Sequence, residues 1–247
     1  FDATASIGEE PEFSTQQLAD GGTLGFDCYR IPSLGVAPNG NVLASWDGRP
    51  NNCADAPQPN SIVGRVSTDS GATWGEQNDI STGITAEPKT GYSDPSIVVD
   101  WETGDVLNFH VKSFDAGYFN SQPGTDPNDR NVVHVAYATS EDNGATWVPD
   151  TVITDQVVAD ETWDSRFATS GNGIQLQYGA HKGRLVQPSV TRMTNGRVAA
   201  VAMLSDDHGA TWYPSAPWGN SMDENKIVEL SDGTLMNNSR SSSGAET

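Results

Sequence analysis

The stretch SDDHGATW at residues 205–212 decides the fold, because it is one of three copies of the same eight-residue pattern. The other copies are STDSGATW at residues 67–74 and SEDNGATW at residues 140–147. The shared Asp is suited to accept hydrogen bonds from the Ser hydroxyl and from nearby backbone N–H groups, which closes a tight turn. The shared Gly permits a positive φ, and the Trp supplies a large apolar anchor. Three matches in one chain indicate an internal repeat rather than chance polar turns.

Short strand patterns precede each copy and predict an all-β chain. Before the first copy, residues 31–37 and 42–46 are typical of a hairpin around Asn39-Gly40, and residues 62–66 form a third strand pattern. The same order returns before the second and third copies, and a fourth round begins at residues 225–230. Each round predicts one antiparallel sheet about the size of a propeller blade.

Two long polar segments, residues 122–131 and 159–172, are predicted to be loops, either at a functional rim or as plain connections. No pattern predicts a helix with any strength, and no domain boundary is evident. A closed propeller needs at least four blades, because each blade's apolar faces must be covered by a neighbour. We therefore expect residues 1–247 to be the N-terminal part of a single, larger ring.

Composition narrows the class of protein and of partner. Only 35% of the 247 residues are hydrophobic, yet seven Trp, seven Phe and six Tyr suffice to build a core. The formal net charge of −20 argues against nucleic acid and against anionic membrane surfaces as partners. No apolar run is long enough to span a bilayer. The four His are scattered and no Cys/His cluster occurs, so we expect neither a zinc site nor a cofactor.

The two cysteines, Cys28 and Cys53, permit one disulfide without requiring it, and two buried thiols are the alternative. Cys28 precedes Arg30 by two residues, and Cys53 precedes Asp55 by two residues, so a bridge would tie these two positions together. We hypothesise that the disulfide forms. The first residues, FDAT, have no charged or apolar leader, so a signal peptide is absent or already removed. An acidic surface suits a secreted protein.

The repeated pattern is the Asp box, and the chain resembles sialidases and other Asp-box β-propellers. The resemblance runs from about residue 17 to residue 240 and is closest to secreted actinobacterial exo-sialidases. It implies a six-bladed β-propeller, of which this chain supplies the first three-plus blades and a downstream segment or fragment supplies the rest. Asp-box propellers include enzymes and pure binding proteins, so the boxes indicate a fold and not a chemistry. The tail at residues 241–247 reads as a flexible or nicked loop.

Two arginines match the sialidase residues that hold the substrate carboxylate. Arg30 lies in Tyr-Arg-Ile-Pro, and Arg240 lies in Asn-Ser-Arg. A planar guanidinium binds a carboxylate through paired hydrogen bonds, which a lysine cannot do. Seen alone, Arg30 would be interpreted as part of a rim salt bridge. The family's third arginine is expected downstream of this chain.

The stretch DGRPNNCADAP, residues 47–57, resembles the sialidase acid loop. The resemblance implies that Arg49 binds substrate and that Asp55 is the general acid/base. Asp47 is the alternative acid, although its neighbouring Gly suggests a turn-forming role. The loop is one residue longer than the family spacing leads us to expect.

Glu224, in Met-Asp-Glu-Asn-Lys, matches the sialidase base that activates a tyrosine nucleophile. A neutral phenol avoids the repulsion that an attacking carboxylate would meet at an anomeric carbon bearing its own carboxylate. The alternative is a surface carboxylate paired with Lys226. All six tyrosines precede Glu224, so the nucleophile is expected downstream.

Four further residues match substrate-binding positions of the family. Asp94, in Ser-Asp-Pro, matches a substrate-binding aspartate. The alternative is an Asp that caps a turn before Pro, which would have the same local sequence. Val111 and Tyr118 match the pocket for the N-acetyl methyl group, where the family often has Phe or Trp instead of Tyr, and ordinary core is the alternative. Gln175 matches a rim position of the third blade.

Together these residues imply a retaining exo-α-sialidase, a glycoside hydrolase acting on sialylated glycans. A non-catalytic Asp-box propeller that binds glycans or proteins is one alternative, and a trans-sialidase is another. The acid and base positions favour an enzyme, because a binding module needs neither.

Overall fold

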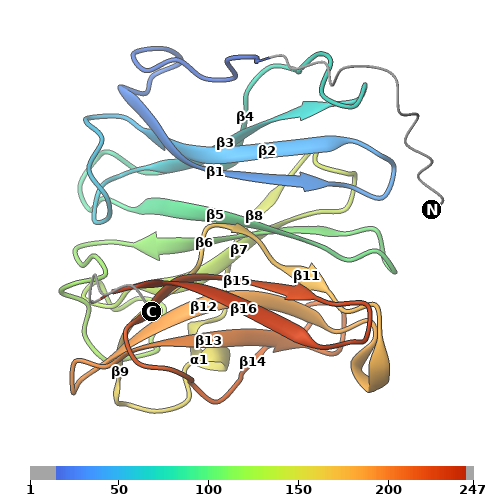
Figure 1. Cartoon of the computed structure of the whole chain (residues 1–247). Helices are drawn as coiled ribbons and strands as arrows, with labels where there is room; N and C mark the ends of the chain where they lie inside the picture. Colours follow the sequence, from blue (N-terminus) through green and yellow to red (C-terminus); the bar gives the residue numbers. More distant parts are fainter. Residues whose placement is uncertain (1–14, 243–247) are drawn as a thin grey trace.

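The computed structural model describes residues 15–242, and the predictions for the leader and for residues 243–247 lie outside this range. Four sheets follow one another in chain order (Figure 1). The first contains β1 (Cys28–Val36), β2 (Val42–Arg49), β3 (Ser61–Ser67) and β4 (Asn78–Ser81). The second contains β5 (Gly91–Val99), β6 (Val106–Ser113), β7 (His134–Ser140) and β8 (Val148–Val152), with the short β10 (Gly171–Asn172) added beside β5.

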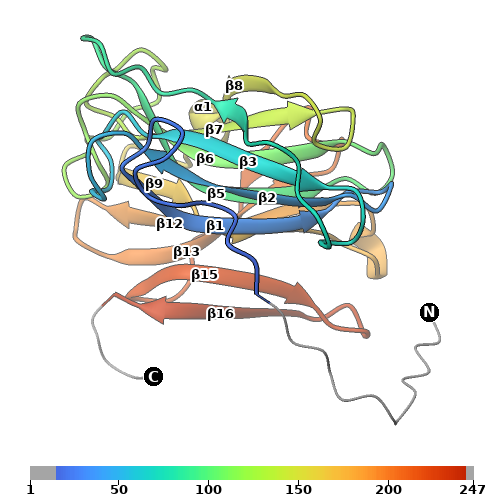
Figure 2. The same cartoon turned by 90° about the horizontal axis from the view of Figure 1, so that it is seen from above.

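The third sheet is built around β12 (Leu185–Met193), which pairs with β13 (Val198–Ser205) on one side. On the other side it pairs with β9 (Trp163–Ala168) and β11 (Ile174–Gln175). The short β14 (Tyr213–Pro214) pairs with the outer side of β13. The fourth sheet is the hairpin of β15 (Met222–Glu229) and β16 (Leu235–Ser241). It lies next to the third sheet at the edge of the assembly (Figure 2). These are consecutive propeller blades, so the all-β prediction is confirmed.

The cores lie between neighbouring sheets, as a propeller requires. Leu43 in β2 and Ala37, which follows β1, pack with Ile97 and Val106 of the second sheet. Between the second and third sheets, Phe109 packs edge-to-face on Trp212, with ring centroids 4.9 Å apart. Each sheet therefore buries both of its apolar faces only when a neighbour is present on each side.

All three Asp boxes have the turn geometry that their residue types predict. In the third box, the Ser205 hydroxyl donates to the Asp207 carboxylate over 2.9 Å, and the same carboxylate accepts from the Thr211 backbone N–H over 2.9 Å. Gly209 has φ +86°, and His208 before it also has a positive φ of 59°. Trp212 is 3% exposed, and its indole N–H donates to the Gly209 carbonyl. The second and third boxes thus anchor their turns to cores between sheets through Trp147 and Trp212, whereas Trp74 of the first box packs on residues of the first sheet.

Three features of the third blade depart from the sequence prediction. The segment predicted to be a loop at residues 159–172 contains β9, and the strand that follows it, β11, has only two residues. A single helical turn, α1 (Thr154–Val157), and one turn of 3-10 helix, η1 (Gly179–His181), also occur, although no helix was predicted. The first strand of this blade is therefore made of two short pieces rather than one long one.

Candidate active site

The first strands of the first, second and fourth sheets share an irregularity at the same end. The pairing register shifts between Arg30 and Ser33 in β1, between Ser93 and Ser96 in β5, and between Met222 and Asn225 in β15. Within these bulges, Ile31 and Asp94 take positive φ values of 58° and 63°. Because a bulge re-aims side chains, it explains how Arg30, Asp94 and Glu224 leave the alternating pattern of their strands.

Arg30 and Asp55 meet beside a disulfide. Cys28 and Cys53 are bonded, with Cα atoms 5.3 Å apart, so the predicted bridge is present. The Cys53 carbonyl accepts from Arg30 Nη1 over 3.0 Å, and the same nitrogen donates to Asp55 Oδ1 over 3.0 Å. The bridge therefore ties the loop that carries Asp55 to the strand that carries Arg30.

Arg49 holds Asp55 from below while being buried itself. Its side chain is 1% exposed, and its Nη1 donates to Asp55 Oδ1 over 2.8 Å. Its Nε and Nη2 donate to Asp47 Oδ2 over 3.2 and 2.7 Å. Asp47 is 0% exposed, and its other oxygen accepts the Asp94 backbone N–H over 2.9 Å. Asp47 is thus enclosed beneath the site, whereas the Asp55 side chain is 74% exposed.

The Asp94 carboxyl lies between charged neighbours of both signs. Burial raises its pKa to about 6, because a carboxylate removed from water is disfavoured. The Arg49 guanidinium opposes this shift, while the carboxylates of Asp55 and Glu224 add to it. Burial likewise raises the pKa of Asp47. The floor of the site therefore holds two carboxyl groups that release their protons less readily than an exposed aspartate.

Glu224 and Arg240 face each other across the β15–β16 hairpin. Arg240 Nη1 donates to Glu224 Oε2 over 2.8 Å, and the two side chains are 65% and 43% exposed. Lys226 does not take Glu224 as its partner, because its ammonium donates to the Thr169 carbonyl over 3.0 Å. The simple Glu224–Lys226 surface pair is therefore not formed.

One cavity of about 310 Å³ is lined by the charged residues Arg30, Asp55, Asp94, Glu224 and Arg240. Val111 and Tyr118 form part of its wall, and Arg49 lies beneath it in contact with Asp55. The structure thus brings together eight of the nine predicted site residues. The cavity is also lined by residues that the sequence did not single out, namely Ile31, Ala56, Phe119, Val133, Arg166, Phe167 and Asp223. Arg166 and Phe167 belong to β9, so missing that strand meant missing them.

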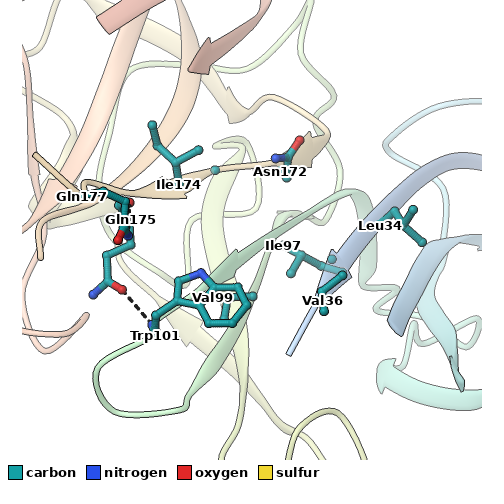
Figure 3. Close-up of a pocket in the computed structure, with 11 residues that line it drawn as sticks. Leu34, Val36, Ile97, Val99, Trp101, Asn172, Ile174, Gln175 and Gln177 are labelled. Atoms are coloured by element: carbon teal, nitrogen blue, oxygen red, sulfur yellow. Dashed lines mark hydrogen bonds between the residues drawn. The ribbon is translucent and has the colours of Figure 1, made fainter. Parts of the chain in front are cut away.

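Gln175 is the predicted residue that lies elsewhere. It lines a second hollow of about 530 Å³ at the other end of β1 and β5 (Figure 3). Its side-chain carbonyl accepts the Trp101 backbone N–H over 2.7 Å, and its amide donates to Asp100 over 2.8 Å. None of the residues lining this hollow is ionisable. Gln175 therefore joins two blades, away from the acid and base positions.

The chain matches the model of the BNR repeat-like domain over residues 31–246. It belongs to that family. This BNR repeat chain is 53% identical over 235 residues to a sialidase of Micromonospora viridifaciens, covering 95% of the chain and 36% of that relative. It is 30% identical to a sialidase of Bacteroides fragilis, covering 87% of the chain and 40% of the relative. The resemblance to bacterial sialidases predicted from the motifs is confirmed.

Solved structures give the same fold for this BNR repeat chain. The Hadza microbial sialidase Hz136 superposes with a TM-score of 0.81 at 29% identity, covering 89% of the chain and 43% of that structure. The leech intramolecular trans-sialidase superposes with a TM-score of 0.76 at 19% identity, which supports the fold alone. The chain spans about two fifths of the length of the two sialidase relatives and of Hz136.

Within residues 15–242, no three His, Cys, Asp or Glu side chains gather as metal ligands would. Over the same range, no helix is long and apolar enough to cross a membrane.

Proposed function

We propose that the protein is a retaining exo-α-sialidase that releases terminal α-linked sialic acid from glycoconjugates outside the cell. The observation that carries the proposal is the convergence of two guanidinium groups, Arg30 and Arg240, and two carboxylates, Asp55 and Glu224, in one cavity. The 53% identical relative called a sialidase supports it. A module that only binds glycans would need neither an acid nor a base.

Arg30 and Arg240 are the proposed receptor for the substrate carboxylate. Sialic acid is anionic at working pH, and each guanidinium can donate paired hydrogen bonds to it. The two side chains are 43% and 65% exposed, so a ligand can reach them. A third arginine of the family pattern is proposed to come from the part of the protein beyond this chain.

Asp55 is the proposed general acid. Of the two candidate acids, Asp55 has the exposed carboxylate. The alternative, Asp47, is buried and bound to Arg49. In this role Asp55 would donate its proton to the leaving oxygen.

Glu224 is the proposed base for a tyrosine nucleophile, whose neutral phenol meets no charge repulsion at the anomeric carbon. Tyr118, the tyrosine that lines the cavity, serves as a wall instead. Its ring is packed edge-to-face against Phe167 with centroids 5.3 Å apart, and burial raises its pKa. Val111 completes the pocket proposed for the N-acetyl methyl group, and Asp94 is proposed to accept from a sugar hydroxyl.

The remaining blades are proposed to pack on the β15–β16 hairpin. This sheet has two strands where the first has four and the second five. Four large apolar residues of this hairpin and its turn are exposed, Val228 by 43%, Leu230 by 41%, Leu235 by 45% and Met236 by 52%. Because the relatives are more than twice as long as the matched segment, a further segment of the same protein is the proposed cover. It would supply the tyrosine and the third arginine.

The test is release of sialic acid by the full-length protein and by residues 1–247 alone. We expect the full-length protein to hydrolyse a sialoside, and the isolated segment to be inactive until the remaining segment is added. Full activity of the segment alone would overturn the incomplete-ring proposal. Tight glycan binding without turnover by the full-length protein would favour the binding module, and transfer of sialic acid to an added sugar would favour a trans-sialidase.

A further inference from the structure

Phe119 is the most exposed large apolar residue in the described part of the chain, at 87%, and it lines the candidate active-site cavity. An aromatic ring in water is unfavourable, since its apolar area stays hydrated. A single exposed apolar residue is common on protein surfaces, but Phe119 lies at a cavity, where a bound ligand could cover its ring.

The turn that carries Phe119 is held in place by its own hydrogen bonds. The Gly117 carbonyl accepts from the backbone N–H groups of Asn120 and Ser121 over 3.2 and 3.0 Å. The Gly117 N–H in turn donates to the Asn120 side chain over 2.9 Å. From the third blade, Arg192 Nη1 donates to the Phe119 carbonyl over 2.7 Å. The Phe119 ring is therefore presented from a fixed backbone.

This turn lies directly against the loop that carries Asp55. A Cβ atom added to Gly117 would come within 2.2 Å of the Ala56 carbonyl oxygen and 3.2 Å of Pro57. Ala56 follows Asp55 in the chain and lines the same cavity. The turn that carries Phe119 thus lies on the same side of the cavity as the loop that carries the proposed acid, Asp55.

Tyr118 connects this rim position to the cavity wall. Its ring meets Phe119 edge-to-face with centroids 5.3 Å apart, and the Arg192 guanidinium lies 5.6 Å from the Tyr118 centroid. Tyr118 is half-buried, whereas Phe119 projects beyond it. A group bound in the cavity would therefore lie against Tyr118, and a substituent extending from it toward solvent would meet Phe119.

We propose that Phe119 is a platform for the sugar to which the sialic acid is linked, and so determines specificity for the leaving group. The inference rests on the proposed function. A neutral pyranose has an apolar C–H face that covers an aromatic ring, and this contact removes apolar area from water. Binding energy from such a remote group also lowers the barrier at the reacting centre, so its loss reduces kcat/KM on glycans.

The experiment compares two substrates in the full-length protein. Sialyllactose has a disaccharide leaving group that can cover the ring, and sialyl fluoride has a leaving group with no sugar. We expect Phe119→Ala to lower kcat/KM on sialyllactose about five- to twentyfold, as for loss of one aromatic contact, and to leave sialyl fluoride unchanged. Phe119→Trp should restore the rate on sialyllactose. Val148→Ala is the matched control, because Val148 is 70% exposed on the outer strand β8.

Each result decides between the alternatives. An equal loss on both substrates would overturn the platform and assign Phe119 to the sialic acid pocket itself. Unchanged kcat/KM on sialyllactose would overturn it as well, because the ring would then have no contact with the leaving sugar. If the wild-type protein hydrolyses neither substrate, the proposed function itself fails, which is distinct from failure of the platform alone.

Discussion

Arg49 donates to the Asp55 carboxylate over 2.8 Å, although 1% of the Arg49 side chain and 74% of the Asp55 side chain are exposed. Arg30 reaches the same carboxylate oxygen over 3.0 Å from the exposed side, where 43% of its side chain is accessible. One oxygen is therefore shared between a buried and an exposed guanidinium. The buried contact fixes the position of Asp55, and the exposed one is available to a ligand.

This difference predicts unequal effects of two matched substitutions on stability. Arg49→Met leaves the buried Asp47 carboxylate without its partner, which should lower the free energy of unfolding by about 3–5 kcal/mol. Arg30→Met breaks an exposed pair and should lower it by less than about 1 kcal/mol. Urea unfolding of the two variants measures both values. Similar small losses in the two variants would mean that the Arg49–Asp47 pair contributes no more than a surface salt bridge.

Asp55→Asn tests the proposed acid through the leaving group. Because acid catalysis of this kind contributes about a hundred- to ten-thousandfold, the variant should lose that much kcat on sialosides with poor leaving groups. The loss should be far smaller on an activated aryl sialoside, whose leaving oxygen needs no proton. Steady-state kinetics on both substrates is the measurement. Equal losses would remove the acid role from Asp55.

The Cys28–Cys53 bridge should contribute to the stability of the acid loop. Labelling under denaturing, non-reducing conditions should find no free thiol in the native protein. For a loop of the observed separation of 25 residues, loop-closure entropy predicts that reduction lowers the free energy of unfolding by about 3 kcal/mol. A Cys28→Ala, Cys53→Ala double variant should match the reduced protein. Two labelled thiols in the untreated protein would show that the bridge does not form.

His208 should make stability depend on pH. Its Nδ1 lies 2.7 Å from Asp100 Oδ2, and the hydrogen bond to Asp100, followed by the charge of Asp100, raises the pKa of His208. Glu102 and Asp207 also face it and add to the increase. Because the folded state binds the proton more tightly, this stabilisation is complete below the ordinary pKa of 6.5. It is lost as the pH rises through the raised value.

The measurement for His208 is the difference in Tm between the wild type and His208→Gln at several pH values. We expect the variant to be less stable at pH near 5.5 and to approach the wild type at alkaline pH. His181→Gln, on the exposed η1 turn, is the matched control. A Tm difference that stays constant with pH would show that His208 acts only through its neutral hydrogen bond.

Local sequence signals were sufficient where neighbours in the chain determine the geometry. The Asp-box turns are closed by their own Ser, Asp and Thr, so they could be predicted from eight residues. The residues singled out from motifs, such as Arg30 and Glu224, line one cavity. The side chains of these residues point into the cavity because of β-bulges, and the apolar alternation of the sequence does not reveal bulges.

Contacts from distant segments explain what the sequence did not predict. The middle of β9 is the polar run Asp164-Ser165-Arg166, which hides the apolar alternation expected of a strand. Arg166 is nevertheless buried, because its Nη1 donates to the Val133 carbonyl over 3.2 Å from another blade. Gln175 was assigned to the site, but its side chain is held by Asp100, far away in the chain. Partners that come from another blade cannot be read from local sequence.

The pairing of β10 with β5 determines how the blades come apart. β10 lies in the segment between β9 and β11 of the third sheet, yet it runs parallel to β5 in the second, with Gly171 opposite Ser96. The Gly173 N–H continues this ladder to the Ile97 carbonyl over 3.0 Å. Opening the third blade therefore breaks hydrogen bonds of the second. We therefore expect the two blades to open as one cooperative unit in hydrogen exchange, unlike repeats that are joined only by packing.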